Sequence, residues 1–118
     1  MPFFNKRKIG FLQEDRAVSY LERNGYKIIG RNFYSKFGEI DIIASKDSYL
    51  HFIEVRSRSS ERYGLSLESV NNKKIKKIIN TAYYFLKKNK IKTDKISISI
   101  ISIDNSGNNI KLKLIKYD

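Results

Sequence analysis

The sequence predicts a mixed α/β fold in which two helices flank a central sheet, with elements in the order αβββαββ. Two stretches have the apolar spacing of amphipathic helices, and five short runs have the β-branched and aromatic composition of strands. The chain has 118 residues, of which 41% are hydrophobic, with one Pro and six Gly. This length and composition predict one folded domain over residues 1–118.

The first half of the chain predicts one helix and three strands. The helix is expected from about Lys8 to Asn24, because the following Gly25 tolerates the left-handed conformation that ends helices. A short polar turn around Asp47 separates two strand-like runs, which indicates a hairpin. The three expected strands are Tyr26–Phe33, Gly38–Ala44 and Tyr49–Arg56.

The second half predicts a long helix followed by two strands. Ser57–Ser66 is a polar loop, and a helix is expected from about Leu67 to Lys90. The last strands, Lys95–Asp104 and Ile110–Tyr117, are joined by a turn rich in Asn, Gly and Ser.

The charge composition narrows the classes of function. Lys and Arg number 24 against 12 Asp and Glu, giving a net charge of +12. This excess indicates a polyanionic partner, either nucleic acid or an anionic membrane surface. The absence of Cys excludes disulfides, Cys-ligated zinc and a thiol nucleophile, and a single His gives little scope for a Ser-His-Asp triad. The chain has neither a signal-peptide pattern nor a membrane-spanning run, so we expect a soluble, cytoplasmic protein.

Three acidic residues occupy positions expected to face inward. Glu14 falls in the middle of the apolar stripe of the first helix, among Ala17, Val18 and Leu21. A carboxylate in such a stripe either pairs with a core Arg, reaches towards solvent, or has a functional role, and the stripe alone leaves these alternatives open.

The other two acids lie on the predicted hairpin. A tight turn at Lys46-Asp47 would pair Ser45 with Ser48, placing Asp41 opposite Phe52 and Glu39 opposite Glu54. Asp41 and Glu54 would then be diagonal neighbours on one sheet face, and a two-residue slip in register would keep them there. A face that merely contacts water is the alternative, but Ile43 and Phe52 on the same face favour packing against a helix.

This arrangement is suited to a hard divalent cation. Converging carboxylates from Asp41, Glu54 and Glu14 would bind Mg²⁺ or Mn²⁺, which can generate hydroxide and neutralise charge on phosphorus. Arg56, two residues beyond Glu54 on the same face, would contact a phosphate or position a water. His51 is expected on the opposite face and has no assigned role.

A wider pattern surrounds these acids: the GEIDIIA and FIEVRSR strands, the run from Gly10 through Glu14 to Asn32, and Lys74 and Ala82. In these residues the sequence resembles the YraN-like family of bacterial proteins. The family is similar to the restriction-endonuclease-like superfamily, including archaeal Holliday-junction resolvases. The resemblance implies a metal-dependent phosphodiesterase in which Asp41 and Glu54 match the metal-binding acids and Glu14 the helix acid. Arg56 stands where the family motif usually has Lys.

Two further positions depart from the family pattern. The first is Gln13, where the family tends to have Gly, and the second is the late strand. That strand often reads Arg-Phe-Asp-Val in the family and reads Lys95-Ile96-Ser97-Ile98 here, so an acid at that point is lost or replaced by Asp94.

The positive charge concentrates on the second helix and just beyond it. Residues 71–95 contain nine Lys and one Asp. Solvated lysines are the simple interpretation of such a helix, but the lack of interspersed acids favours contact with phosphates. The residues predicted to bind nucleic acid are Arg58, Arg62, Lys73, Lys74 and Lys77.

The leading hypothesis is a Mg²⁺- or Mn²⁺-dependent endonuclease, with DNA favoured over RNA as the partner. The alternative is a catalytically degenerate nucleic-acid-binding module on the same fold. A protein that docks on anionic membranes ranks last, because no basic amphipathic anchor with a bulky apolar face is present. Cleavage of a two-fold symmetric substrate would favour a homodimer.

Overall fold

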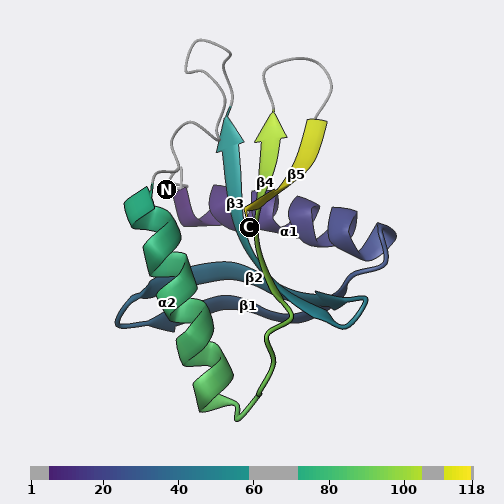
Figure 1. The fold of residues 1–118 in the computed structure, drawn as a ribbon. Helices are drawn as coiled ribbons and strands as arrows, with labels where there is room; N and C mark the ends of the chain where they lie inside the picture. The colour runs from purple at the N-terminus through teal and green to yellow at the C-terminus, as the bar shows by residue number, and fades with distance from the viewer. Residues whose placement is uncertain (1–5, 59–71, 105–110, 118) are drawn as a thin grey trace.

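The computed structural model describes residues 6–58, 72–104 and 111–117, and within these ranges two helices and five strands form. Figure 1 shows their arrangement, with α1 and α2 packed against one twisted sheet. The elements are α1 (Lys6–Arg23), β1 (Lys27–Ser35), β2 (Gly38–Lys46), β3 (Tyr49–Arg58), α2 (Asn72–Lys88), β4 (Ile96–Asp104) and β5 (Lys111–Tyr117).

The five strands form one mixed sheet in the order β1-β2-β3-β4-β5. The pairs β1–β2, β2–β3 and β4–β5 are antiparallel, whereas β3 and β4 are parallel and are connected through α2. The predicted α/β class, the element order αβββαββ and the mixed sheet flanked by helices are confirmed. The arrangement is consistent with a restriction-endonuclease-like core.

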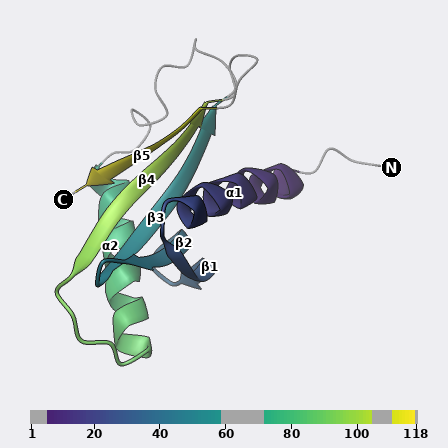
Figure 2. The ribbon, with the colours of Figure 1, turned by 90° about the vertical axis from the view of Figure 1, so that its right-hand side faces the viewer.

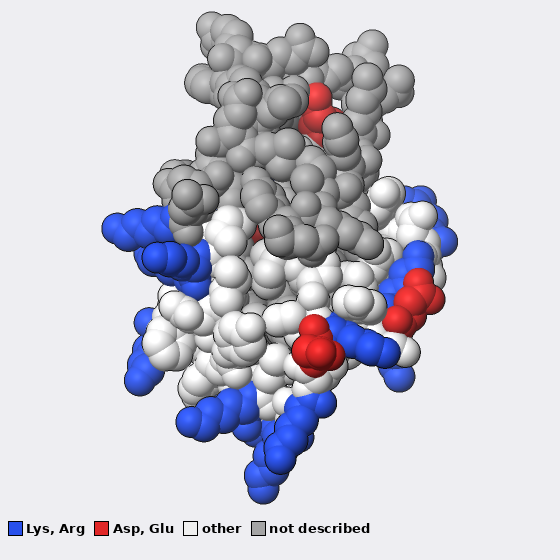
Figure 3. Space-filling view, in the orientation of Figure 1, with Lys and Arg blue, Asp and Glu red and all other residues white. Residues whose placement is uncertain are grey.

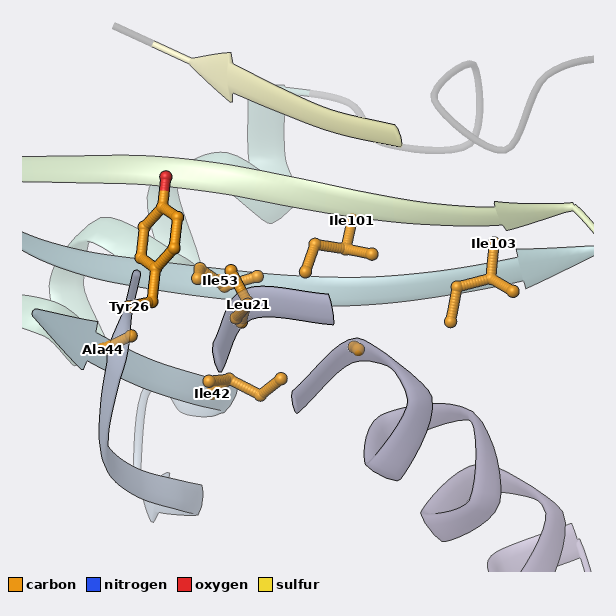
Figure 4. Packing of buried hydrophobic residues seen from close by; sticks show 8 residues of the cluster. Leu21, Tyr26, Ile42, Ala44, Ile53, Ile101 and Ile103 are labelled. Carbon is orange, nitrogen blue, oxygen red and sulfur yellow. The ribbon is translucent and has the colours of Figure 1, made fainter. Parts of the chain in front are cut away.

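The two helices cover opposite faces of the sheet, as Figure 2 shows from the side. On one face, α1 places Ala17 and Leu21 against strand residues such as Ile53 and Ile101, and Figure 4 shows this cluster at close range. On the other face, Ile78, Ala82 and Phe85 of α2 pack on Ile43 and Phe52. The sheet is therefore buried on both sides in its centre, where β-branched residues dominate.

Both helices end in the same hydrogen-bonded motif. Gly25 has φ +88°, and the N–H of Tyr26 donates to the carbonyl of Leu21 while Gly25 N–H donates to Glu22. Ile91 and Lys90 repeat this pattern at the end of α2, with Lys90 at φ +55°. The predicted stop after Asn24 is thus confirmed, and α2 ends two residues before the predicted Lys90. Its predicted start at Leu67 lies outside the described residues.

The register of the β2–β3 hairpin differs from the prediction by two residues. Asp47 and Ser48 both have positive φ, as a two-residue type I′ turn requires, so Lys46 pairs with Tyr49 and Ser45 with Leu50. Phe52 consequently lies opposite Ile43, and the predicted pairings of Asp41 with Phe52 and Glu39 with Glu54 are wrong. The two-residue slip preserves the face on which each side chain lies.

Strand alternation also changes in the middle of β2. Ile42 packs on the α1 side, but Ile40 packs on the α2 side, although a regular strand would place both on one face. The neighbouring β1 changes at the same level, where Asn32 has φ +54° between Arg31, paired with Ile42, and Phe33, paired with Ile40. Ile40 and Ile42, although two residues apart, therefore face opposite sides of the sheet.

No helix in the described ranges is long and apolar enough to cross a membrane.

Candidate functional site

The candidate site lies where β2 and β3 separate. The β2–β3 ladder ends at the pair Ile42–Ile53. Beyond this pair, among the described strands, the residues of β2 that precede Ile42 pair only with β1, and the residues of β3 that follow Ile53 pair only with β4, as far as Arg58. Figure 1 shows the two strands diverging at this point. A fork of this kind exposes backbone groups that a continuous ladder would satisfy, so polar side chains are needed there.

Asp41 of β2 fills the fork. Its Oδ2 accepts a hydrogen bond of 2.7 Å from the backbone N–H of Val55, a donor that has lost its strand partner. Burial raises the pKa of the Asp41 carboxyl to about 7; the Val55 hydrogen bond opposes the shift, and the charges of Glu54, Glu39 and Glu14 add to it. Asp41 is therefore a buried acid whose ionised form is disfavoured by its described surroundings.

Glu54 of β3 is the second acid at the fork, and it faces α2. Its Oε1 lies 2.9 Å from Lys74 Nζ and 3.6 Å from an Arg56 guanidinium nitrogen. The Glu54 side chain is 15% exposed, and its buried Oε2 accepts no hydrogen bond from any described residue. The buried Nε of Arg56 likewise has no hydrogen-bond partner within the described ranges. Lys74 of α2 thus reaches Glu54 in the space between helix and sheet.

A cleft of about 420 Å³ opens beside Glu54, between the start of β2 and the first half of α2. Lysines form one wall and acids the other, and the lining residues are Gly38, Glu39, Glu54, Lys73, Lys74, Lys77 and Ile78. Three of the predicted nucleic-acid-binding residues, Lys73, Lys74 and Lys77, thus line one cleft together with a predicted catalytic acid. Figure 3 shows Lys and Arg side chains along the flank of α2.

Glu14 does not join this pair. It is 6% exposed on α1, and its Oε1 accepts hydrogen bonds from Arg31 Nε at 3.2 Å and from Asn32 Nδ2 at 3.0 Å. Arg31 also pairs with Asp15 at 2.7 Å. Of the alternatives left open for Glu14, pairing with an Arg is the observed one, and the expected convergence of three acids is not found.

Two of the predicted nucleic-acid-binding side chains, those of Arg58 and Arg62, lie outside the described residues. Arg58 ends β3, but its side chain lies outside the described part, and so does the whole of Arg62. His51 is buried with its ring edge-on to Tyr26, at 5.1 Å between centroids, away from the acids as expected.

The donor set suits a cation held by two carboxylates. Among the described residues, no group of three Asp, Glu, His or Cys side chains is arranged to hold a metal ion. Mg²⁺ is commonly bound through one or two carboxylates and several waters, so Asp41 and Glu54 suffice for such an ion. Glu54 Oε2 has no hydrogen-bond partner among the described residues, and the charges of three nearby acids raise the pKa of Asp41; both observations fit a divalent cation.

The sequence analysis did not identify the side chains that pair with Glu14, nor the place of Glu39 in the cleft. Arg31 and Asn32 hold Glu14 from 17 and 18 residues away, and Glu39 lines the cleft despite its predicted pairing with Glu54. An arginine in an otherwise strand-like run was the available signal for a partner of Glu14.

Comparison with known proteins assigns the family. The model of the uncharacterised protein family UPF0102 matches residues 13–103. This chain belongs to the UPF0102 family. A UPF0102 protein of Persephonella marina is 50% identical over 94 residues, covering 80% of this chain and 81% of that protein. A Clostridium perfringens relative is 46% identical over 104 residues, covering 88% and 84%, and a Sulfurihydrogenibium relative is 41% identical over 106 residues, covering 90% of each chain.

The UPF0102 assignment confirms the resemblance to the YraN-like family, and it covers every site residue described above. The family description names no activity. The chemistry of this UPF0102 protein must therefore be argued from the fork and the cleft.

The ion pair of Glu14 gives the first prediction. Arg31→Ala is expected to destabilise the fold by roughly 1–2 kcal/mol, because it leaves a buried carboxylate with only the Asn32 amide as partner. Urea denaturation measures this change, and Lys27→Ala, an exposed change on the same strand, is the control. A double variant with Glu14→Gln should recover most of the loss; if it does not, the Glu14–Arg31 pair is not the cause.

Proposed function

We propose that this UPF0102 protein is a metal-dependent endonuclease that hydrolyses phosphodiester bonds in DNA. The observation that carries the proposal is the position of Asp41 and Glu54 at a strand fork, beside a cleft walled by lysines of α2. The sequence resemblance to nuclease-like folds agrees with this arrangement. Hydrolysis adds water across one phosphorus–oxygen bond and leaves a phosphate on one fragment and a hydroxyl on the other.

Residues of the fork and of the cleft would share the work of this reaction. Lys73 and Lys77 would attract the phosphate backbone, since both are exposed and line the cleft. Asp41 and Glu54 would hold Mg²⁺ or Mn²⁺, which would activate a water molecule for attack and neutralise charge that develops on the phosphate. Lys74 and Arg56, both paired with Glu54, would orient the scissile phosphate.

Lys74 is a second cation that can take the place of the motif Lys, where this chain has Arg56. An arginine in place of the motif Lys cannot release a proton, whereas a lysine can. Lys74 brings an ammonium group to within 2.9 Å of Glu54 from the opposite wall. We therefore assign the part of the motif's fixed cation to Lys74 together with Arg56.

The test is cleavage by the full chain of four-way branched, single-stranded and duplex DNA, and of RNA, with Mn²⁺, Mg²⁺ or EDTA. We expect cleavage of DNA with a divalent cation and none with EDTA. Absence of cleavage under every condition, or cleavage that persists in EDTA, would contradict the proposal.

A degenerate nucleic-acid-binding module is the second candidate, favoured by Arg56 at the motif position and by the two cations already paired with Glu54. It predicts binding without turnover. Cleavage that appears only in Arg56→Lys would support degeneration, and cleavage by the natural sequence would exclude it.

The salt dependence of binding follows from either candidate. Four to six phosphate contacts from α2 would give a log–log slope of affinity against salt of roughly −4 to −5 on duplex DNA. Replacing Lys73 and Lys77 by Ala should reduce the slope by about 2. Fluorescence anisotropy in EDTA at several KCl concentrations measures this, with Lys27→Ala as the control. An unchanged slope would remove these two lysines from the interface.

A cytoplasmic location and a homodimer also belong to the proposal. Nucleic acid is available in that compartment, and two copies would allow both strands of a symmetric substrate to be cut. Light scattering of the purified chain with and without a branched DNA measures the oligomeric state.

A further inference from the structure

A second hollow lies one turn further along α2, outside the candidate site. Its volume is about 670 Å³, and it is formed by the β1–β2 turn and the second half of α2. We call it the aromatic groove, and its lining residues are Lys36, Phe37, Asn80, Tyr83, Tyr84, Lys87 and Lys88.

The groove exposes three aromatic rings. Tyr83 is 57% exposed, Phe37 39% and Tyr84 37%. The centroids of Phe37 and Tyr84 are 6.2 Å apart at 64°, and Tyr84 also lies 6.0 Å from the ring of Phe33 beneath it. Clustered exposed rings are uncommon on a soluble surface unless a ligand or partner covers them.

All the charged residues that line the groove are basic. Lys36, Lys87 and Lys88 are exposed, and no acid is among the groove residues. Lys36 Nζ lies 5.3 Å from the centre of the Phe37 ring, and Lys88 Nζ lies 5.9 Å from that of Phe33. Aromatic faces interleaved with ammonium groups suit a ligand with flat bases and phosphates.

The turn that carries Phe37 is held against α2 before any ligand arrives. The Ser35 hydroxyl accepts the Phe37 N–H at 3.0 Å and lies 3.4 Å from the Thr81 hydroxyl of α2. Gly38, at φ +148°, comes so close to the helix that a Cβ there would lie 3.6 Å from Lys77 Cβ. A preformed groove loses little entropy on binding.

We propose that the aromatic groove binds unpaired nucleotides of a DNA strand by stacking bases on Tyr83 and its neighbours. The inference deepens the proposed function and rests on it for the choice of DNA. Gly38 and Lys77 line the cleft, whereas Phe37 and Asn80, one and three residues away, line the groove. A strand leaving the cleft would therefore meet the rings directly, which assigns the protein a substrate with a single-stranded segment next to the cut.

The experiment measures binding of the full chain to a labelled 20-nucleotide oligo(dT) and to a 20-base-pair duplex, by fluorescence anisotropy in EDTA. Tyr83→Ala is expected to weaken oligo(dT) binding about ten-fold, the size of one lost base stack, and duplex binding less than about two-fold. Tyr83→Phe keeps the ring and should bind as the natural sequence does. Tyr34→Ala, an exposed tyrosine outside the groove, is the matched control.

Three outcomes would overturn the inference. Tyr83→Ala could leave oligo(dT) binding unchanged, or it could weaken the binding of duplex and of single strand equally. The natural sequence could also bind oligo(U) more tightly than oligo(dT). Capture by anionic vesicles that oligo(dT) does not compete away would reassign the groove to a membrane. Because EDTA prevents metal-dependent turnover, failure of the groove is separate from failure of the nuclease. Tyr83-dependent binding without any cleavage would support the groove on a degenerate module, and cleavage with Tyr83-independent binding would reject the groove alone.

Discussion

Glu54→Gln is expected to lower Mn²⁺-dependent DNA cleavage by at least ~100-fold. The change removes one of two carboxylates assigned to the metal, and a bound metal contributes several kcal/mol to stabilising charge at phosphorus. About 1.4 kcal/mol corresponds to a ten-fold change in rate. Gln keeps the volume of the side chain and an oxygen that can accept from Lys74, so the loss should come from the chemistry rather than from the fold.

The control for this prediction is Glu22→Gln, an isosteric change at an exposed acid of α1. Cleavage rates under single-turnover conditions are compared with thermal unfolding of each variant. Glu22→Gln should cleave at the natural rate. If Glu54→Gln cleaves within about three-fold of the natural rate while remaining folded, the fork is not the catalytic centre.

The second large effect is a pH-dependent gain of stability in Asp41→Asn. The Asp41 carboxyl has a pKa of about 7 in the folded protein against 3.8 as the ordinary value. Between these values the folded state holds a proton that the unfolded state has released. Stability therefore falls as pH rises through this window, by up to about 4 kcal/mol, and the loss is complete above the folded pKa.

Asn cannot ionise, and its amide oxygen can still accept the Val55 N–H. In EDTA, Asp41→Asn should match the natural sequence near pH 4 and exceed its free energy of unfolding by a few kcal/mol at pH 8. Urea denaturation from pH 4 to 8 measures the difference. Asp47→Asn, in the exposed hairpin turn, should show none of this trend.

Divalent cations should offset the greater stability of Asp41→Asn at pH 8. A metal that binds the ionised Asp41 stabilises the folded state by mass action, so Mn²⁺ at pH 8 should raise the melting temperature of the natural sequence and not that of Asp41→Asn. A difference between the two proteins that does not change with pH would show that Asp41 is not the group that titrates.

The sequence by itself determined the elements and much of the site. Gly25 after Asn24 predicted the end of α1, because a left-handed residue is favourable there for glycine, and the turn signal between β2 and β3 predicted the hairpin. Two-residue periodicity kept Glu54 and Arg56 on the face that meets α2 despite the register error. These features depend on backbone preferences within a few residues, which the sequence displays directly.

Tertiary structure alone decided how those elements meet. The register followed from positive φ at both Asp47 and Ser48, and the fork at Asp41 follows from β2 parting from β3, which stays paired with β4 as far as Arg58. Arg31 and Asn32 hold Glu14, and Lys74 meets Glu54 across 20 residues. Such contacts depend on which strands pair and how far they twist apart, and no local preference encodes the distance between side chains on separate elements.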